Sequence, residues 1–164
     1  MSIRIVIFGI IGFFISLFIM YRTEHGLPGI RKYDSNFRLL DMRFRYNSKI
    51  LYNTLERIGT NGMKLYRNFL FLDFFFIACF LIVMIFITQK VTEINIIIFT
   101  LSGFAISRSI FDVLENISLI TLIKMYPSKN TVIANFCSWA TTLKFISLYL
   151  WLAGILISFI LKLI

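Results

Sequence analysis

Four long runs of apolar residues divide this sequence and limit what it can fold into. The runs cover about 3–21, 68–88, 94–123 and 131–161. A helix needs about 20 apolar residues to cross the hydrocarbon core of a bilayer, so each run is long enough to span it. Hydrophobic residues make up 59% of the chain and charged residues 15%, whereas about 45–50% and about 25% are usual in soluble proteins. We therefore predict an all-α, four-helix transmembrane bundle that forms a single domain over 1–164, and we exclude a soluble enzyme.

The first run, 3–21, also has some features of a signal peptide. The apolar part of a signal peptide usually has 7–15 residues and precedes a cleavage site made of small residues. This run is longer, and Tyr21-Arg22-Thr23-Glu24 follows it. We therefore expect a retained transmembrane helix.

The segment 22–67 is polar and basic, with ten Lys or Arg and four acidic residues. Within it, Leu51, Leu55 and Ile58 recur at helical spacing, which predicts an amphipathic helix over 48–58 that ends at Gly59. A basic amphipathic helix beside spanning segments typically lies in the headgroup layer of the membrane. We expect this position for it, and docking onto a partner helix is the alternative.

The distribution of basic residues predicts the orientation of the chain. With four spans, the loops 22–67 and 124–130 share one side and carry twelve Lys or Arg, whereas the other side carries three. Because cytoplasmic loops collect Lys and Arg, both termini should be extracytoplasmic, in a bacterial inner membrane or an organelle membrane. The same rule accounts for the net charge of +9 without nucleic acid as a partner. Expected partners are the bilayer, anionic headgroups at the basic loop, and further copies or a larger membrane complex.

Charged residues within the apolar runs are the candidate functional residues, because they are costly at membrane depth. The third run holds Arg108, Asp112, Glu115 and Asn116, which share one face about 100° wide on a helix of 3.6 residues per turn. Arg108 and Asp112 form an i,i+4 pair.

The positions of the loops predict that these residues meet Asp73 and Lys144. Asp112 precedes Pro127 by 15 residues and Lys144 follows it by 17, so a helical hairpin places them at similar depth. Asp73 lies a few residues into the second span from the same side. We therefore predict one intramembrane cluster, in which Lys144 pairs with Asp112 or Glu115. Because Arg108 competes for Asp112, Glu115 is the better partner.

Small residues suggest where the third and fourth spans approach each other. Gly103-x-x-x-Ser107 and Gly154-x-x-x-Ser158 both have the spacing that allows close helix contact in membranes.

The chain lacks the residues that several classes of cofactor-dependent enzyme need. His25 is the single histidine and lies in the first loop, while Cys79 and Cys137 fall within apolar runs and form no C-x-x-C pair. Neither a P-loop nor a G-x-S-x-G motif occurs. We therefore predict no cofactor and no metal. If the protein is an enzyme, its catalytic residues are unknown.

Several motifs occur in an order that is similar to the order found in a known group of proteins. These motifs are Leu40-Asp41-x-Arg43-Phe44-x-Tyr46, Tyr52-x-x-Leu55-Glu56-x-x-Gly59-x-x-Gly62-x-x-x-Tyr66-x-x-Phe69-x-x-x-Asp73-Phe74, Asp112-x-x-Glu115-Asn116 and Thr141-x-x-Lys144. Together they resemble a group of small, uncharacterised four-helix integral membrane proteins with an intramembrane D-x-x-E-N motif. The resemblance covers about 38–150 and implies the four-span fold, without an activity.

The expected function is non-enzymatic: ion or proton handling, or service as an accessory subunit of a membrane assembly. The alternative is a cofactor-independent acid–base enzyme that acts on a lipid-like substrate. A closed pocket that reaches the charged cluster would favour the enzyme. A water-filled path across the bundle would favour ion handling. The cluster can also serve only to hold the helices together.

Overall fold

The computed structural model describes residues 1–163, except for the side chain of residue 163, and its regular structure over this range is entirely helical. The elements are α1 (Ile3–Arg22), α2 (Leu27–Arg31), the short 3-10 helix η1 (Leu40–Met42), α3 (Ser48–Val91), α4 (Asn95–Met125) and α5 (Thr131–Leu163). Helices α1, α3, α4 and α5 are long and apolar enough to cross a membrane. The prediction of an all-α bundle with four candidate spans is confirmed.

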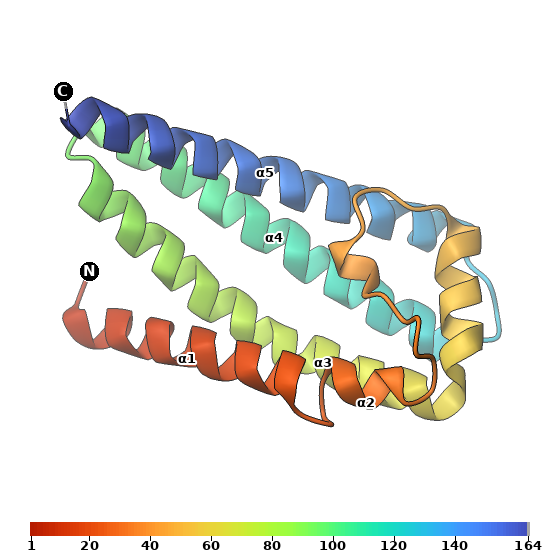
Figure 1. The fold of residues 1–164 in the computed structure, drawn as a ribbon. Coiled ribbons are helices and arrows are strands. Elements are labelled where there is room, and N and C mark those ends of the chain that lie inside the picture. Colours follow the sequence, from red (N-terminus) through yellow and green to blue (C-terminus); the bar gives the residue numbers. More distant parts are fainter. Residues whose placement is uncertain (164) are drawn as a thin grey trace.

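The four long helices run side by side, and α2 and η1 lie in the half of the bundle away from the termini (Figure 1). Helices α4 and α5 form a tight hairpin, α3 packs on α4, and α1 packs on α3. Both termini lie at the end opposite η1 (Figure 1). Helices α1 and α5 therefore form the two outer edges of the arrangement.

Helix α3 is divided by Gly59. The side chain of Asn47 accepts a hydrogen bond from the backbone N–H of Ile50 at 2.9 Å and caps the start of the helix. Gly59 has φ 62° and ψ −176°, a combination that is essentially restricted to glycine. The chain therefore turns at Gly59, and 48–58 lies across the end of the bundle while the rest of α3 runs along it (Figure 1).

The apolar face of 48–58 packs against protein, so the prediction that it enters the headgroup layer is wrong. Leu51 and Leu55 are fully buried, in a core shared with Leu119 and Leu122 of α4 and Ala134 of α5. The periodicity identified the apolar face correctly. The last turns of α4 and the first turns of α5 contribute to the core that covers that face.

The segment between α2 and α3 contributes to the core, although it is largely polar and basic. It bends back so that η1 lies beside α4 and α5 (Figure 1). Phe37 and Leu40 are buried against Tyr66 of α3: the Phe37 and Tyr66 ring centroids are 5.3 Å apart, and the Leu40 N–H donates to the Tyr66 hydroxyl at 3.4 Å. A buried apolar loop of this kind fixes the position of its neighbour, Asp41.

The half of the bundle nearest the termini has an apolar core. Met84, Leu101 and Ala105 are buried there around Trp151, whose indole N–H donates to Thr88 Oγ1 at 3.0 Å. Gly154 packs against Leu101, since an added Cβ would lie 2.3 Å from Leu101 Cδ2. Gly103 faces open space, so the predicted contact through Gly103 is wrong and only the α5 glycine lies in the interface.

Candidate functional site

The polar face predicted for the third span is buried along α4. Arg108, Asp112, Glu115 and Asn116 are each no more than 5% exposed. Leu101 and Ala105 continue the same face toward the termini and are buried as well. A strip of four polar side chains is thus enclosed by α3, α5 and the η1 segment.

Lys144 of α5 is the centre of the cluster. Its ammonium lies 2.6 Å from Glu115 Oε2 and 3.0 Å from Asp112 Oδ1, and it donates a hydrogen bond to the Asp41 carbonyl oxygen at 2.8 Å. Three acceptors from two elements therefore surround a side chain that is 4% exposed. Such compensation is what a buried ammonium requires.

Asp112 is shared between two cations. Its Oδ2 lies 2.5 Å from Arg108 Nη2, in the i,i+4 pair, while its Oδ1 faces Lys144. The Arg108 guanidinium also lies over the Phe80 ring, 4.6 Å from the centroid. Arg108 is thereby held between an anion and an aromatic face.

Asp73 joins the cluster through Asn116, whose side-chain amide donates to Asp73 Oδ2 at 2.7 Å. Asp73 therefore belongs to the predicted cluster, and its contact on α4 is with the residue that follows Glu115. Among the residues that the structure describes, Asp73 has no ion-pair partner. The α3 carboxyl is thus hydrogen-bonded but not neutralised by a neighbouring cation.

The predicted cluster did not include Asp41, which the η1 segment carries to it. Asp41 is 6% exposed, and its Oδ1 is buried without a hydrogen-bond partner among the described residues. Burial raises the pKa of the Asp41 carboxyl above its ordinary value. The available signal was its apolar flanks, Leu39-Leu40 and Met42, which are unusual in an otherwise basic segment.

Polar groups of α5 complete the surroundings of Glu115 and also were not predicted as site residues. The Thr141 hydroxyl donates to Glu115 Oε1. The Tyr46 hydroxyl donates to Cys137 Sγ at 3.1 Å, and the Tyr46 N–H donates to Ser138 Oγ at 2.9 Å. Burial raises the pKa of the Tyr46 hydroxyl, so it stays protonated and acts as a donor. The loop before α3 is therefore anchored directly to α5.

The cluster lies about one bilayer thickness from the ends near the termini. The stretches Asp73–Val91, Asn95–Asp112 and Lys144–Lys162 of α3, α4 and α5 are each about 26–27 Å long at 1.5 Å per residue. The hydrocarbon core of a bilayer is about 30 Å thick. If the helices enter the bilayer at their ends near the termini, the charged side chains lie near the opposite surface of the hydrocarbon core. This is the side of the basic segments 22–67 and 124–130, called the basic side below.

A partly enclosed cavity of about 220 Å³ borders the cluster. Its charged lining consists of Asp41, Asp73, Arg108, Asp112 and Lys144. Its other walls are largely apolar and come from α1, α3 and α5, with Leu17, Met20, Phe76, Phe80, Phe145 and Leu148. The cavity thus combines charged groups with apolar side chains that suit hydrocarbon.

Two residues that line this cavity have buried polar atoms with no hydrogen-bond partner within the described part of the chain. These atoms are Arg108 Nε and Nη1 and Asp41 Oδ1. Buried polar groups without partners are rare in folded proteins and commonly mark a site that water or a ligand completes.

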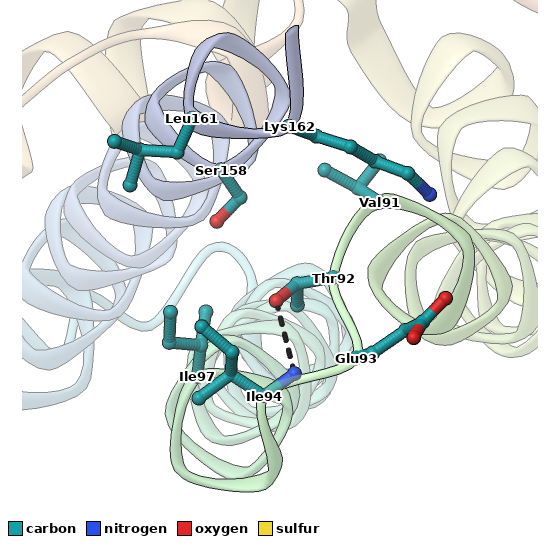
Figure 2. A pocket seen from close by; sticks show the side chains of 8 residues that line it. All are labelled: Val91, Thr92, Glu93, Ile94, Ile97, Ser158, Leu161 and Lys162. Carbon is teal, nitrogen blue, oxygen red and sulfur yellow. Dashed lines mark hydrogen bonds between the residues drawn. The ribbon is translucent and has the colours of Figure 1, made fainter. Parts of the chain in front are cut away.

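A second hollow, of about 290 Å³, lies at the opposite end of the bundle, between the α3–α4 turn and the end of α5 (Figure 2). Its polar contacts are local: Thr92 Oγ1 accepts from the Ile94 N–H at 3.3 Å, and Lys162 donates to the Lys90 carbonyl at 3.3 Å. Glu93 and Lys162 are both exposed there. This hollow has none of the buried charge of the cluster, so the cavity beside Lys144 is the better candidate site.

No group of three His, Cys, Asp or Glu side chains is arranged as metal ligands over the described residues. The carboxyl groups of the cluster face Lys144, Arg108 and Asn116 instead. None of the protein-family models, curated proteins or solved structures compared with the chain matches it. The resemblance to small four-helix membrane proteins therefore stays a prediction, and the site has to be interpreted from its geometry.

Proposed function

We propose that this protein binds the polar group of an amphipathic molecule in the cavity beside Lys144. The observation that carries the proposal is the mixed lining of the cavity, which combines five charged residues with apolar side chains of three helices. A binding site for a lipid-like molecule needs this combination, since convergent polar groups orient a ligand whose remainder lies against apolar walls.

The position of the cavity gives such a molecule a route of entry. Helix α1 packs on α3, and α1 and α5 both contribute to the cavity walls from opposite edges of the bundle (Figure 1). An amphiphile in the basic-side leaflet can therefore enter between α1 and α5 with its head at the boundary and its tail in the hydrocarbon.

Ion or proton passage across the whole membrane has less support. From 74 to 89, from 95 to 107 and from 145 to 161 the spans contain no Asp, Glu, Lys, Arg or His. The buried core around Met84 and Trp151 fills this half of the bundle. A proton relay needs ionisable groups along its length, and those of α3, α4 and α5 within the bundle are concentrated in the cluster.

The second candidate function is cofactor-independent acid–base chemistry on the bound molecule. Asp41 and Asp73 both line the cavity, and no cation lies within ion-pair distance of either carboxyl in the described structure. Carboxyl groups of this kind can exchange a proton with a substrate placed between them. We also keep the proposals that the protein is an accessory subunit of a membrane assembly or forms a homo-oligomer.

For orientation, we keep the proposal that both termini are extracytoplasmic, in a bacterial inner membrane or an organelle membrane, as the charge count of the loops indicates. A C-terminal fusion to a reporter that is active only in the cytoplasm should give no signal. A strong signal would reverse the assignment.

Native mass spectrometry of the protein, extracted in a mild detergent, tests the binding function. Leu148→Trp places a larger side chain in the cavity wall, while Leu152→Trp, one turn along α5, alters an exposed position outside it. We expect the wild type and Leu152→Trp to retain a co-purifying amphiphile and Leu148→Trp to lose it. Equal retention by all three proteins, or none in the wild type after supplementation with total membrane lipid, would contradict the proposal.

A further inference from the structure

Four arginines, one at the end of α2 and three in the segment between α2 and α3, line a groove of about 660 Å³. They are Arg31, Arg38, Arg43 and Arg45. Arg31, Arg38 and Arg45 are exposed and Arg43 is partly buried. Four positive charges from 15 consecutive residues thus border one depression.

These arginines are not neutralised by the acidic residues of their own segment. Glu24 pairs with Lys32 at 2.6 Å, and Asp34 pairs with Arg57 at 3.0 Å. Asp41 points into the bundle and is 6% exposed. Over the described residues none of the four arginines forms an ion pair, and Arg43 Nε is buried without a partner. The groove therefore keeps its positive charge available for an anion.

An apolar groove meets the arginine groove at Tyr21. This second groove, of about 610 Å³, runs over the last turns of α1 and is lined by Phe14, Ile15, Leu17, Phe18, Tyr21 and Arg22. Tyr21 lines both depressions. A continuous surface thus leads from the apolar span, past the aromatic side chain at its end, to the arginines.

We propose that these two grooves form one binding site for an anionic phospholipid of the basic-side leaflet. The phosphate-bearing headgroup contacts the arginines, whose guanidinium groups match phosphate oxygens in geometry and charge. One acyl chain lies along the Phe14–Phe18 stretch of α1. Leu17, Tyr21 and Met42 also line the cavity beside Lys144, but none of the four arginines does. The proposal therefore does not depend on what that cavity binds.

The orientation of the two grooves favours a lipid over a soluble phosphate compound. The apolar groove lies on the membrane-spanning helix α1, and the arginines lie beyond the end of that helix, so the order of the grooves matches the order of chain and headgroup in a leaflet. A soluble anion would use the arginines alone and would leave the apolar groove without a role.

The test is a competition measured by native mass spectrometry of the full chain in a neutral detergent. Phosphatidylglycerol and phosphatidylcholine with identical acyl chains are added in equal amounts, and the ratio of the two bound lipids is recorded. We expect phosphatidylglycerol to be preferred by the wild type. In Arg38→Gln/Arg45→Gln the preference should fall roughly tenfold or more, since each arginine near an anionic surface contributes about fivefold in affinity.

Matched variants separate a built site from general positive charge. Lys49→Gln/Lys64→Gln removes two exposed charges of α3 outside the groove and should leave the preference unchanged. Ile15→Trp obstructs the apolar groove and should reduce retention of the lipid, whereas Ile7→Trp, two turns earlier on α1, should not. Equal losses in the two charge pairs would overturn the site, because the effect would then be diffuse.

A competition with inorganic phosphate distinguishes a lipid ligand from a soluble anion. At constant ionic strength, phosphate in large excess over the lipid should leave the bound lipid ratio unchanged. Displacement of phosphatidylglycerol by phosphate, or absence of any preference between the two lipids in the wild type, would overturn the assignment.

Discussion

At the scale of single residues, Lys144 shows how a buried charge stays tolerable in this bundle. It contacts Glu115, Asp112 and the Asp41 carbonyl, whereas Asp112 keeps a second cation in Arg108. Removal of one member of a buried pair costs about 3–5 kcal/mol, because the other charge is stranded. The charge stranded by loss of Lys144 is that of Glu115.

Lys144→Met should therefore lower the free energy of unfolding by about 3–5 kcal/mol, and adding Glu115→Gln should recover much of that loss. Adding Asp112→Asn instead should recover little, because that change strands Arg108. Denaturant unfolding in mixed micelles measures all three. If both double variants were no more stable than Lys144→Met, the pairing would be without energetic importance.

Asp41 predicts a pH dependence with a definite sign. Burial raises the pKa of its carboxyl despite the opposing charge of Lys144, while Asp112 and Tyr66 also face it. The folded protein then holds this proton at pH values at which the unfolded chain has lost it, so stability decreases as pH rises above the ordinary aspartate pKa. Asp41→Asn removes that contribution.

We expect the melting temperature of Asp41→Asn, relative to the wild type, to increase between pH 4 and pH 8. A difference that is constant over this range would mean that the pKa of Asp41 is the same in the folded and unfolded states. Thermal unfolding in one detergent and at fixed ionic strength provides the measurement.

The residue scale also shows what the sequence could predict of the candidate site. Helical periodicity placed Arg108, Asp112, Glu115 and Asn116 on one face, and the loop position placed Lys144 at the same depth. Asp41 could not be placed in this way, because it reaches the cluster through a loop whose course depends on the burial of Phe37 and Leu40 against α3. Local patterns do not carry that tertiary information.

At the scale of elements, the 48–58 part of α3 shows the same limit. Its amphipathic pattern predicts an apolar face and the direction of that face, but not whether lipid or protein covers it. In the structure the covering elements are α4 and α5. With Leu55→Cys and Asn53→Cys, a water-soluble thiol reagent should label residue 53 rapidly and residue 55 slowly.

This difference should persist in detergent micelles as well as in vesicles, because protein and not lipid shields residue 55. The native Cys79 and Cys137 are buried and give little background. Rapid labelling of residue 55 in detergent alone would restore the membrane-surface interpretation of this helix.

The α4–α5 contact provides a matched pair of glycines. Gly154→Val would push against Leu101 in the core and should destabilise the protein by about 1–3 kcal/mol, as overpacking usually does. Gly103→Val faces open space and should change stability little. Comparison of the two melting temperatures tests the register of the hairpin, and equal effects would contradict it.

At the scale of the whole molecule, the fold divides into two parts with different cores. Toward the termini the helices pack through apolar side chains over about one bilayer thickness. Toward the basic side, the η1 segment and the 48–58 part of α3 close the end of the bundle around buried charges. Hydropathy predicted the apolar half well, since that half depends on the composition and length of the helices. The half with the buried charges depends on long-range packing.

The central claim is that the charged cluster orients a bound amphiphile as well as holding the helices together. The most direct measurement is the lipid occupancy of Lys144→Met/Glu115→Gln, in which the charge balance of the bundle is kept while the cavity loses its ammonium. We expect native mass spectrometry to show a folded protein with most of the co-purifying amphiphile lost. Retention of the amphiphile at the wild-type level in this stable variant would contradict the claim and leave the cluster a purely structural role.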